Sequence, residues 1–201
     1  MKRGTLISLD GLDGAGKTTQ IVALADALRA RGHAVRETRE PTTGPFGRRI
    51  RDAARGGKRP TPAEELAWFF ADRRQHVARV VRPALARGEV VLTDRYYPST
   101  VAYQGARGIA WQRILALSEA EFPIPDLALV LEIAPGAGLG RVAARGGAHE
   151  PLFEEEEFLA RVAAVFAAIE RPYVARVAGH GPTAEVTEAI RRVVRERTGL
   201  L

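Results

Sequence analysis

The sequence predicts an α/β fold with a mostly parallel sheet, formed by a single domain over residues 1–201. Three observations predict it. Short apolar runs alternate with longer amphipathic stretches, 46% of the residues are hydrophobic and 27% charged, and cysteine is absent. This composition excludes a disordered chain. Without cysteine, a disulfide scaffold and Cys-ligated zinc or iron–sulfur sites are excluded as well. We find no internal repeat or linker, and therefore expect one domain.

The expected elements follow in order along the chain. Apolar, β-type runs predict strands at 5–9, 34–38, 90–92, 127–133 and, more weakly, 174–178. Amphipathic patterns predict helices at 18–31 and 62–87, two between 95 and 126, and others at 136–145, 155–175 and 183–197. Gly32 and Gly88 follow the first two helices and are typical helix stops. Because strands alternate with helices, we expect a parallel sheet.

The basic charge balance does not by itself identify a partner. The net charge is +6, and 27 of the 30 basic residues are arginine. A basic chain can bind nucleic acid, a membrane surface or small polyanions. The abundance of Ala, Gly and Arg is also typical of a GC-rich genome, so we expect most arginines to be plain surface charges and expect no nucleic-acid or membrane partner. The sequence has no apolar run near the ~18 residues of a membrane span and no signal peptide, which favours a cytoplasmic protein.

A complete phosphate-binding loop follows the first predicted strand. Residues 11–18 read Gly-Leu-Asp-Gly-Ala-Gly-Lys-Thr and match the pattern G-x-x-x-x-G-K-[ST]. Glycines let the backbone N–H groups point at phosphate oxygens, and the helix that follows adds its positive end. Lys17 can bridge the β- and γ-phosphates, and the Thr18 hydroxyl can hold Mg²⁺. The predicted nucleotide-binding residues are Gly11, Leu12, Asp13, Gly14, Ala15, Gly16, Lys17, Thr18 and Thr19.

The loop predicts binding of a nucleoside triphosphate but leaves the reaction open. A motor, a switch and a kinase all remain. A guanine-specific switch reads its base with an Asn-Lys-x-Asp loop, and this chain contains no asparagine. A large ATPase motor needs more chain than 201 residues. A small kinase with its own acceptor site therefore fits best. The alternative from another class is a non-catalytic switch or a nucleic-acid-binding P-loop protein.

Three further segments make the chain resemble the thymidylate kinase family. They are Thr38-Arg39-Glu40-Pro41, Asp94-Arg95-Tyr96, and the continuation from Ser99 to Gly105 that contains Tyr103-Gln104. The resemblance extends from about residue 4 to about residue 175. It implies the P-loop nucleotide-kinase fold, with five parallel strands flanked by helices and a small lid. It also implies a homodimer and ATP-dependent phosphorylation of dTMP to dTDP with Mg²⁺. The nearest rival is another nucleotide or deoxynucleoside kinase of the same architecture.

Several residues are candidates for the base and sugar of dTMP. Phe69 and Arg73 lie four positions apart on a predicted helix and share a face. By their pattern alone they would be a core Phe and a solvated Arg; the resemblance assigns them to stacking on thymine and hydrogen bonding to it. Tyr103 and Gln104 match positions that line the deoxyribose and the base. Thr100 matches a small polar residue that reaches the base, although a helix cap or a surface residue fits it as well.

Other residues are candidates for the phosphates and the metal. Asp94 ends an apolar strand, at the edge where open α/β sheets bind ligands, and can hold Mg²⁺ together with Thr18. Arg95 and Arg39 are candidates for the acceptor phosphate. By resemblance, the Asp13 carboxylate accepts a hydrogen bond from the 3′-hydroxyl of dTMP. One further phosphate ligand is expected among Arg48, Arg49 and Arg51.

The resemblance places the last catalytic charge in a lid. Some family members carry an arginine in the phosphate loop, but Gly14 stands at that position here. The chain therefore resembles the bacterial type, with the arginine in a lid at about residues 141–157. Leu152 stands where relatives carry that arginine. Arg141 and Arg145 are then expected to join Lys17 and Arg95 as catalytic residues, although both can instead pair with nearby acids.

Overall fold

Five parallel strands form one sheet in the order β2-β3-β1-β4-β5 in the computed structural model, which describes residues 3–56, 60–137 and 152–201. The strands are β1 Thr5–Gly11, β2 Val35–Arg39, β3 Val90–Asp94, β4 Leu127–Glu132 and β5 Val174–Ala178. All five lie close to the predicted positions, and the prediction of a parallel α/β sheet is confirmed. The central strands β1, β3 and β4 are almost wholly buried because both faces of a parallel sheet are covered.

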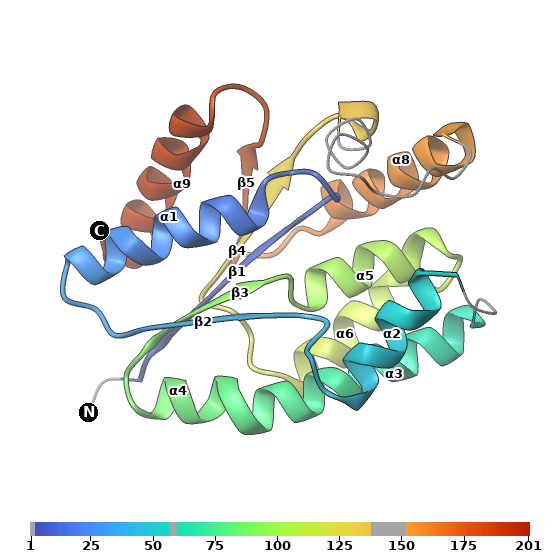
Figure 1. Ribbon diagram of the computed structural model, residues 1–201, viewed down its shortest axis with the longest axis horizontal. Helices are drawn as coiled ribbons and strands as arrows, with labels where there is room; N and C mark the ends of the chain where they lie inside the picture. The colour runs from blue at the N-terminus through green and yellow to red at the C-terminus, as the bar shows by residue number, and fades with distance from the viewer. Residues whose placement is uncertain (1–2, 57–59, 138–151) are drawn as a thin grey trace.

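Helices cover the sheet on both sides (Figure 1). They are α1 Lys17–Ala30, α2 Pro45–Ala54, α3 Pro62–His76, the π-helical segment η1 Val77–Val81, α4 Arg82–Ala86, α5 Tyr97–Ala106, α6 Trp111–Glu121, α8 Leu152–Ala168 and α9 Thr183–Thr198. Figure 1 shows α1 and α9 on one side of the sheet and α3 to α6 on the other. The start of β1 and the C-terminus lie on the left of the view, away from α5 and α8.

Two helix predictions differ from the structure. The predicted helix at 62–87 is helical throughout, but it changes to π-helix over Val77–Val81 before α4. The predicted helix at 155–175 ends at Ala168, because Val174 is buried as the first residue of β5 and Ile169 packs in the core. Most of the predicted helix at 136–145 lies outside the described residues.

The sheet register brings three segments to one edge. Leu9 of β1 is paired with Asp94 of β3, and Arg39 of β2 is paired with the same Asp94. The residues that follow β1, β2 and β3 therefore emerge side by side at the carboxyl ends of the strands. This is where open α/β sheets bind ligands.

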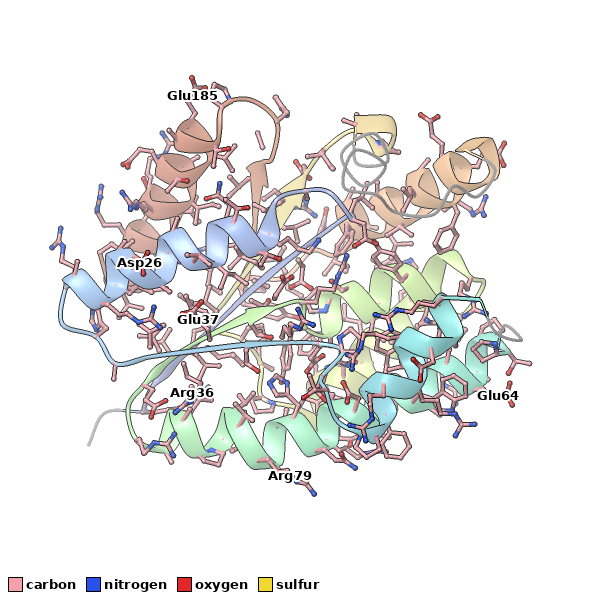
Figure 2. The ribbon with its side chains drawn as sticks, in the orientation of Figure 1. Asp26, Arg36, Glu37, Glu64, Arg79 and Glu185 are labelled. Carbon is pink, nitrogen blue, oxygen red and sulfur yellow. The ribbon has the colours of Figure 1, made fainter. Side chains whose placement is uncertain are left out.

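Many arginine side chains lie on the surface of the protein. Arg29 pairs with Glu37 at 2.7 Å, and Arg79 and Glu185 point away from the sheet on opposite sides of the molecule (Figure 2). Exposed pairs of this kind contribute only ~0–1 kcal/mol to stability. No helix within the described ranges is both long and apolar enough to cross a membrane.

Candidate active site

The phosphate loop connects β1 to the open N-terminus of α1. Gly16 is the N-cap residue of α1, with a φ of 87° and no side-chain cap. A glycine is suited to this left-handed conformation because it has no Cβ. The uncapped N–H groups of the first turn and the positive end of the helix dipole favour an anion at this point.

The side chain of Lys17 points back into the phosphate loop and binds its backbone. It is buried, and its Nζ donates to the carbonyl oxygens of Leu12 at 2.8 Å and Gly11 at 3.3 Å. Burial, and then the nearby charge of Arg95, lower the pKa of Lys17 to about 8. The acidic groups around Lys17 do not offset the effect of its burial on this pKa, and a bound phosphate would add a compensating anion.

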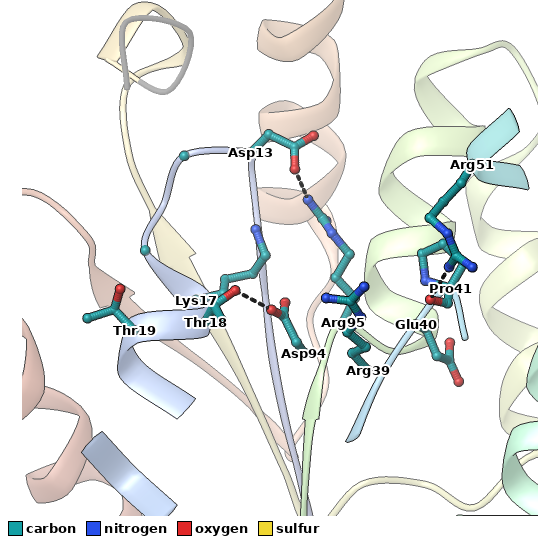
Figure 3. A pocket seen from close by; sticks show the side chains of 12 residues that line it. Asp13, Lys17, Thr18, Thr19, Arg39, Glu40, Pro41, Arg51, Asp94 and Arg95 are labelled. Atoms are coloured by element: carbon teal, nitrogen blue, oxygen red, sulfur yellow. Dashed lines mark hydrogen bonds and ion pairs between the residues drawn. The ribbon is translucent and has the colours of Figure 1, made fainter. Parts of the chain in front are cut away.

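A single cavity of about 240 Å³ joins the loop to the edge of the sheet (Figure 3). Its lining residues are Asp13, Gly14, Gly16, Lys17, Thr18, Thr19, Arg39, Glu40, Pro41, Arg51, Asp94 and Arg95. Six of the nine predicted loop residues are among them. Gly11, Leu12 and Ala15 are not, and the side chains of Leu12 and Ala15 pack into the core.

Thr18 and Asp94 form the part of the cavity suited to a metal. The Thr18 Oγ1 donates to Asp94 Oδ2 at 2.7 Å (Figure 3). A hydroxyl and a carboxylate supply the oxygen ligands that Mg²⁺ prefers. No group of three His, Cys, Asp or Glu side chains gathers as a metal site in the described part of the chain. The pair therefore fits Mg²⁺ that is held mainly by nucleotide phosphates and water.

Arg95 is fixed by four partners. Its Nη2 lies 2.6 Å from Asp13 Oδ1 and 3.4 Å from the Tyr103 hydroxyl, and its Nη1 donates to the Gly11 carbonyl oxygen and to Ser99 Oγ. Burial would lower the pKa of Arg95, but Tyr103 and Asp13 raise it well above its usual value. Desolvation would raise the pKa of Asp13, but Arg95 and Lys17 outweigh it and lower that pKa.

The position of Arg95 depends on Asp10, a residue to which sequence reasoning gave no role. Arg95 has a φ of 68°, the one left-handed non-glycine residue in the described ranges. Asp10 is fully buried, and its Oδ1 accepts from the backbone N–H groups of Tyr96 and Ser99 and from Ser99 Oγ. These hydrogen bonds hold the turn after β3 against the end of β1. The partners of Asp10 lie 86 and 89 positions away along the chain, so no local sequence pattern indicates them.

A second buried network surrounds Arg73. Its Nη2 lies 2.7 Å from Glu40 Oε2 and donates to Thr100 Oγ1 at 2.7 Å. Glu40 Oε1 lies 2.8 Å from His76 Nδ1, and the other ring nitrogen of His76 lies 2.7 Å from Thr38 Oγ1. Burial would raise the pKa of Glu40, but Arg73 and the His76 hydrogen bond outweigh it and lower that pKa. Sequence reasoning named Arg73 and Thr100 but missed Glu40 and His76.

The base candidates lie beside this network but do not line the cavity. Arg73 Nη1 and Gln104 Oε1 are buried and have no hydrogen-bond partner among the described residues. Phe69 is half-buried and stands outside the core cluster, whereas Phe70 belongs to it. Thr100 is buried, and the N-cap of α5 is Tyr96, so the reading of Thr100 as a cap or surface residue is wrong.

The three arginines of α2 have different surroundings, and one of them lines the cavity. Arg51 lines the cavity and donates from Nη1 to the carbonyl oxygens of Pro41 and Thr42. Arg48 donates to the Thr43 carbonyl oxygen, and Arg49 stacks on Trp68 with its guanidinium carbon 4.1 Å from the ring centre. Trp68 is half-buried under Arg49 and does not belong to the core cluster.

Comparison with known proteins agrees with this geometry. The sequence profile described as thymidylate kinase matches residues 9–190. A thymidylate kinase of Xanthomonas campestris pv. campestris is 46% identical over 169 residues, which are 84% of this chain and 73% of that protein. A thymidylate kinase of Desulfotalea psychrophila is 43% identical over 174 residues, which are 87% of this chain and 86% of that protein. The chain belongs to the thymidylate kinase family.

Membership in the thymidylate kinase family confirms the resemblance seen in the sequence and the expected fold. The structure does not test the assignment of catalytic arginines to a lid. Arg141 and Arg145 lie outside the described residues, and so does most of the expected lid at 141–157. Leu152 is the first residue of α8. The catalytic role of the two arginines therefore stays a prediction.

Proposed function

We propose that this protein transfers the γ-phosphoryl group of ATP to dTMP and so makes dTDP for deoxynucleotide biosynthesis. One observation carries the proposal. A single cavity is lined on one side by the phosphate loop and on the other by Arg39, Arg51 and Arg95, which come from three different segments. Two phosphate-bearing molecules can therefore meet in it, as a nucleoside monophosphate kinase requires.

The triphosphate occupies the loop side of the cavity. The N–H groups of residues 14–18 and the N-terminus of α1 hold the β-phosphate, and Lys17 contacts the β- and γ-phosphates. Thr18 and Asp94 would hold Mg²⁺, which would neutralise negative charge on the triphosphate when bound.

The acceptor occupies the other side. Thymine stacks on Phe69 and forms hydrogen bonds with Arg73 and Gln104. Tyr103 lies against the deoxyribose. Burial raises the pKa of Tyr103 to about 12, so its hydroxyl stays protonated and donates to Asp13 at 3.2 Å. Asp13 in turn can accept from the 3′-hydroxyl of dTMP.

The transfer needs positioning and charge rather than a base. An oxygen of the dTMP phosphate is already ionised and attacks the γ-phosphorus in line. The bond from that phosphorus to the bridging oxygen breaks, and ADP leaves with both electrons. Lys17 and Arg95, together with Arg39 and Arg51, stabilise the spread negative charge.

The proposal includes a lid at about residues 141–157, in which Arg141 or Arg145 supplies a further positive charge. Alanine at both positions should lower kcat about 100-fold with little change in either KM. The proposal also includes a single kinase domain over residues 1–201, a homodimer by analogy with the family, and a cytoplasmic site of action, where dTMP and ATP are available.

A thermal-shift panel tests the acceptor. The purified protein is heated with dTMP, dUMP, UMP, CMP or AMP, because a ligand that binds only the folded state raises Tm. We expect dTMP to give the largest rise. A larger rise with CMP or AMP would favour another nucleotide kinase of the same architecture.

A further inference from the structure

Two buried polar atoms lie free next to the expected base position. Arg73 Nη1 can only donate a hydrogen bond, and Gln104 Oε1 can only accept one. Arg73 and Gln104 are nearly closed to solvent, with 1% of each residue exposed. Arg73 contacts Thr100, one turn before Gln104 on α5, so both free atoms belong to one region. A buried unpaired group costs free energy until a ligand satisfies it.

The orientation of the Gln104 amide is set by a residue on another helix. Gln104 Nε2 donates to Glu65 Oε2 at 2.5 Å. The same carboxylate forms an ion pair with Arg107, whose Nη2 also donates to the Pro60 carbonyl oxygen at 2.7 Å. An ionised carboxylate accepts hydrogen bonds and donates none. The amide nitrogen must therefore face Glu65, and the amide oxygen must face away from it.

We propose that Glu65 is a positioning residue for base specificity, which it controls by holding the amide oxygen of Gln104 toward the base. This inference rests on the proposed function. Thymine presents O4 as an acceptor and N3–H as a donor, which complement the Arg73 donor and the Gln104 acceptor. Cytosine presents the opposite pair, an amino donor at C4 and an acceptor at N3. The arrangement therefore selects against dCMP.

Removal of the carboxylate should release the amide. In Glu65→Leu, the guanidinium of Arg107, which contacts the same Glu65 oxygen as Gln104, remains, and it is a donor. The amide oxygen can then turn toward Arg107, so that the nitrogen faces the base. Glu65→Gln retains an oxygen that can accept from Gln104 and should behave in between.

The test measures kcat/KM for dTMP, dCMP and dUMP in the whole protein. We expect the dTMP-to-dCMP ratio to fall roughly 10-fold or more in Glu65→Leu, and less in Glu65→Gln. The dTMP-to-dUMP ratio should stay unchanged, because uracil and thymine share N3–H and O4. Glu119→Gln is the matched control: Glu119 also pairs with an arginine, Arg171, but on another surface. It should leave both ratios unchanged.

A double-mutant cycle separates positioning from a merely structural role. In a Gln104→Met background, Glu65→Leu should have no further effect on the dTMP-to-dCMP ratio. If Glu65→Leu does not fold, the inference is tested by the smaller fall of the dTMP-to-dCMP ratio that is expected in Glu65→Gln. An unchanged ratio in the folded Glu65 variants overturns the inference, while the proposed function stands. A wild-type protein that does not phosphorylate dTMP overturns the proposed function, and the inference with it.

Discussion

The guanidinium of Arg73 and the carboxylate of Glu40 form an ion pair that is almost closed to solvent. Their side chains are 1% and 3% exposed, and the Arg73 Nε and Nη2 atoms lie 2.9 and 2.7 Å from the same oxygen, Glu40 Oε2. Arg73 comes from α3, and Glu40 follows β2. The pair therefore fixes both the connection after β2, which lines the cavity, and the arginine expected at the base.

Glu40→Gln should weaken both stability and dTMP binding. A buried guanidinium that loses its charged partner costs about 3 kcal/mol of unfolding free energy. The KM for dTMP should rise about 10-fold, since Arg73 is no longer held, while the KM for ATP changes little. Urea unfolding and steady-state kinetics measure the two effects. An equal rise of both KM values would contradict a local role at the acceptor side.

The Glu40→Gln variant also tests how the free energy of unfolding depends on pH. Because the pKa of Glu40 is lowered in the folded state from 4.5, its contribution to stability is complete above pH 4.5 and is lost as the pH falls through the lower value. The difference in unfolding free energy between wild type and Glu40→Gln should therefore shrink in acid. A difference that is constant with pH would show that Glu40 is not ionised in the folded protein.

ATP binding should take up a proton at alkaline pH. The pKa of Lys17 is about 8, and bound phosphates would raise it. Above pH 8, ATP affinity should then fall by up to about tenfold per pH unit. Titration calorimetry in buffers of different ionisation heat measures the proton uptake. Lys17→Met is the control and should bind weakly without this uptake; an equal uptake in both proteins would assign it to another group.

Arg51 and Arg48, both on α2, provide a test variant and a matched control for binding of the acceptor phosphate. Arg51→Met should raise the KM for dTMP about 10-fold, because Arg51 lines the cavity and a hydrogen bond to a charged group contributes about 1.5–3 kcal/mol. Arg48→Met, three positions earlier on the same helix, should leave it within about twofold, since exposed charges contribute little. If Arg48→Met has the larger effect, the acceptor phosphate lies elsewhere.

The sequence was sufficient where a local pattern determines the geometry. The apolar runs located all five strands, and the phosphate loop located Lys17 and Thr18, because loop, strand and helix are contiguous. It was insufficient where distant segments meet. The choice of Arg51 among three neighbouring arginines depends on how α2 sits against the segment after β2. Glu40, Asp10 and Glu65 act through residues that are 33, 86 and 39 positions away, respectively.

Tyr103 should exclude a ribose. Its side chain packs against the site, with the ring centre 5.1 Å from the Arg95 guanidinium carbon. Tyr103→Ala should lower the preference for dTMP over ribothymidine monophosphate by about 1–3 kcal/mol, the usual limit for steric discrimination of this size. Tyr103→Phe keeps the ring and should keep the preference. If the kcat/KM ratio changes in Phe as much as in Ala, the hydroxyl rather than the ring discriminates.

Phosphorylation of dTMP is tested most directly by a coupled assay of ADP release with ATP, Mg²⁺ and one nucleoside monophosphate at a time. The acceptors are dTMP, dUMP, UMP, CMP and AMP, and the product of each reaction is identified by chromatography. We expect ADP release to depend on dTMP, dTDP to form in equal amount, and kcat/KM to be highest for dTMP. No ADP release with dTMP, or a higher kcat/KM for CMP or AMP, would contradict it.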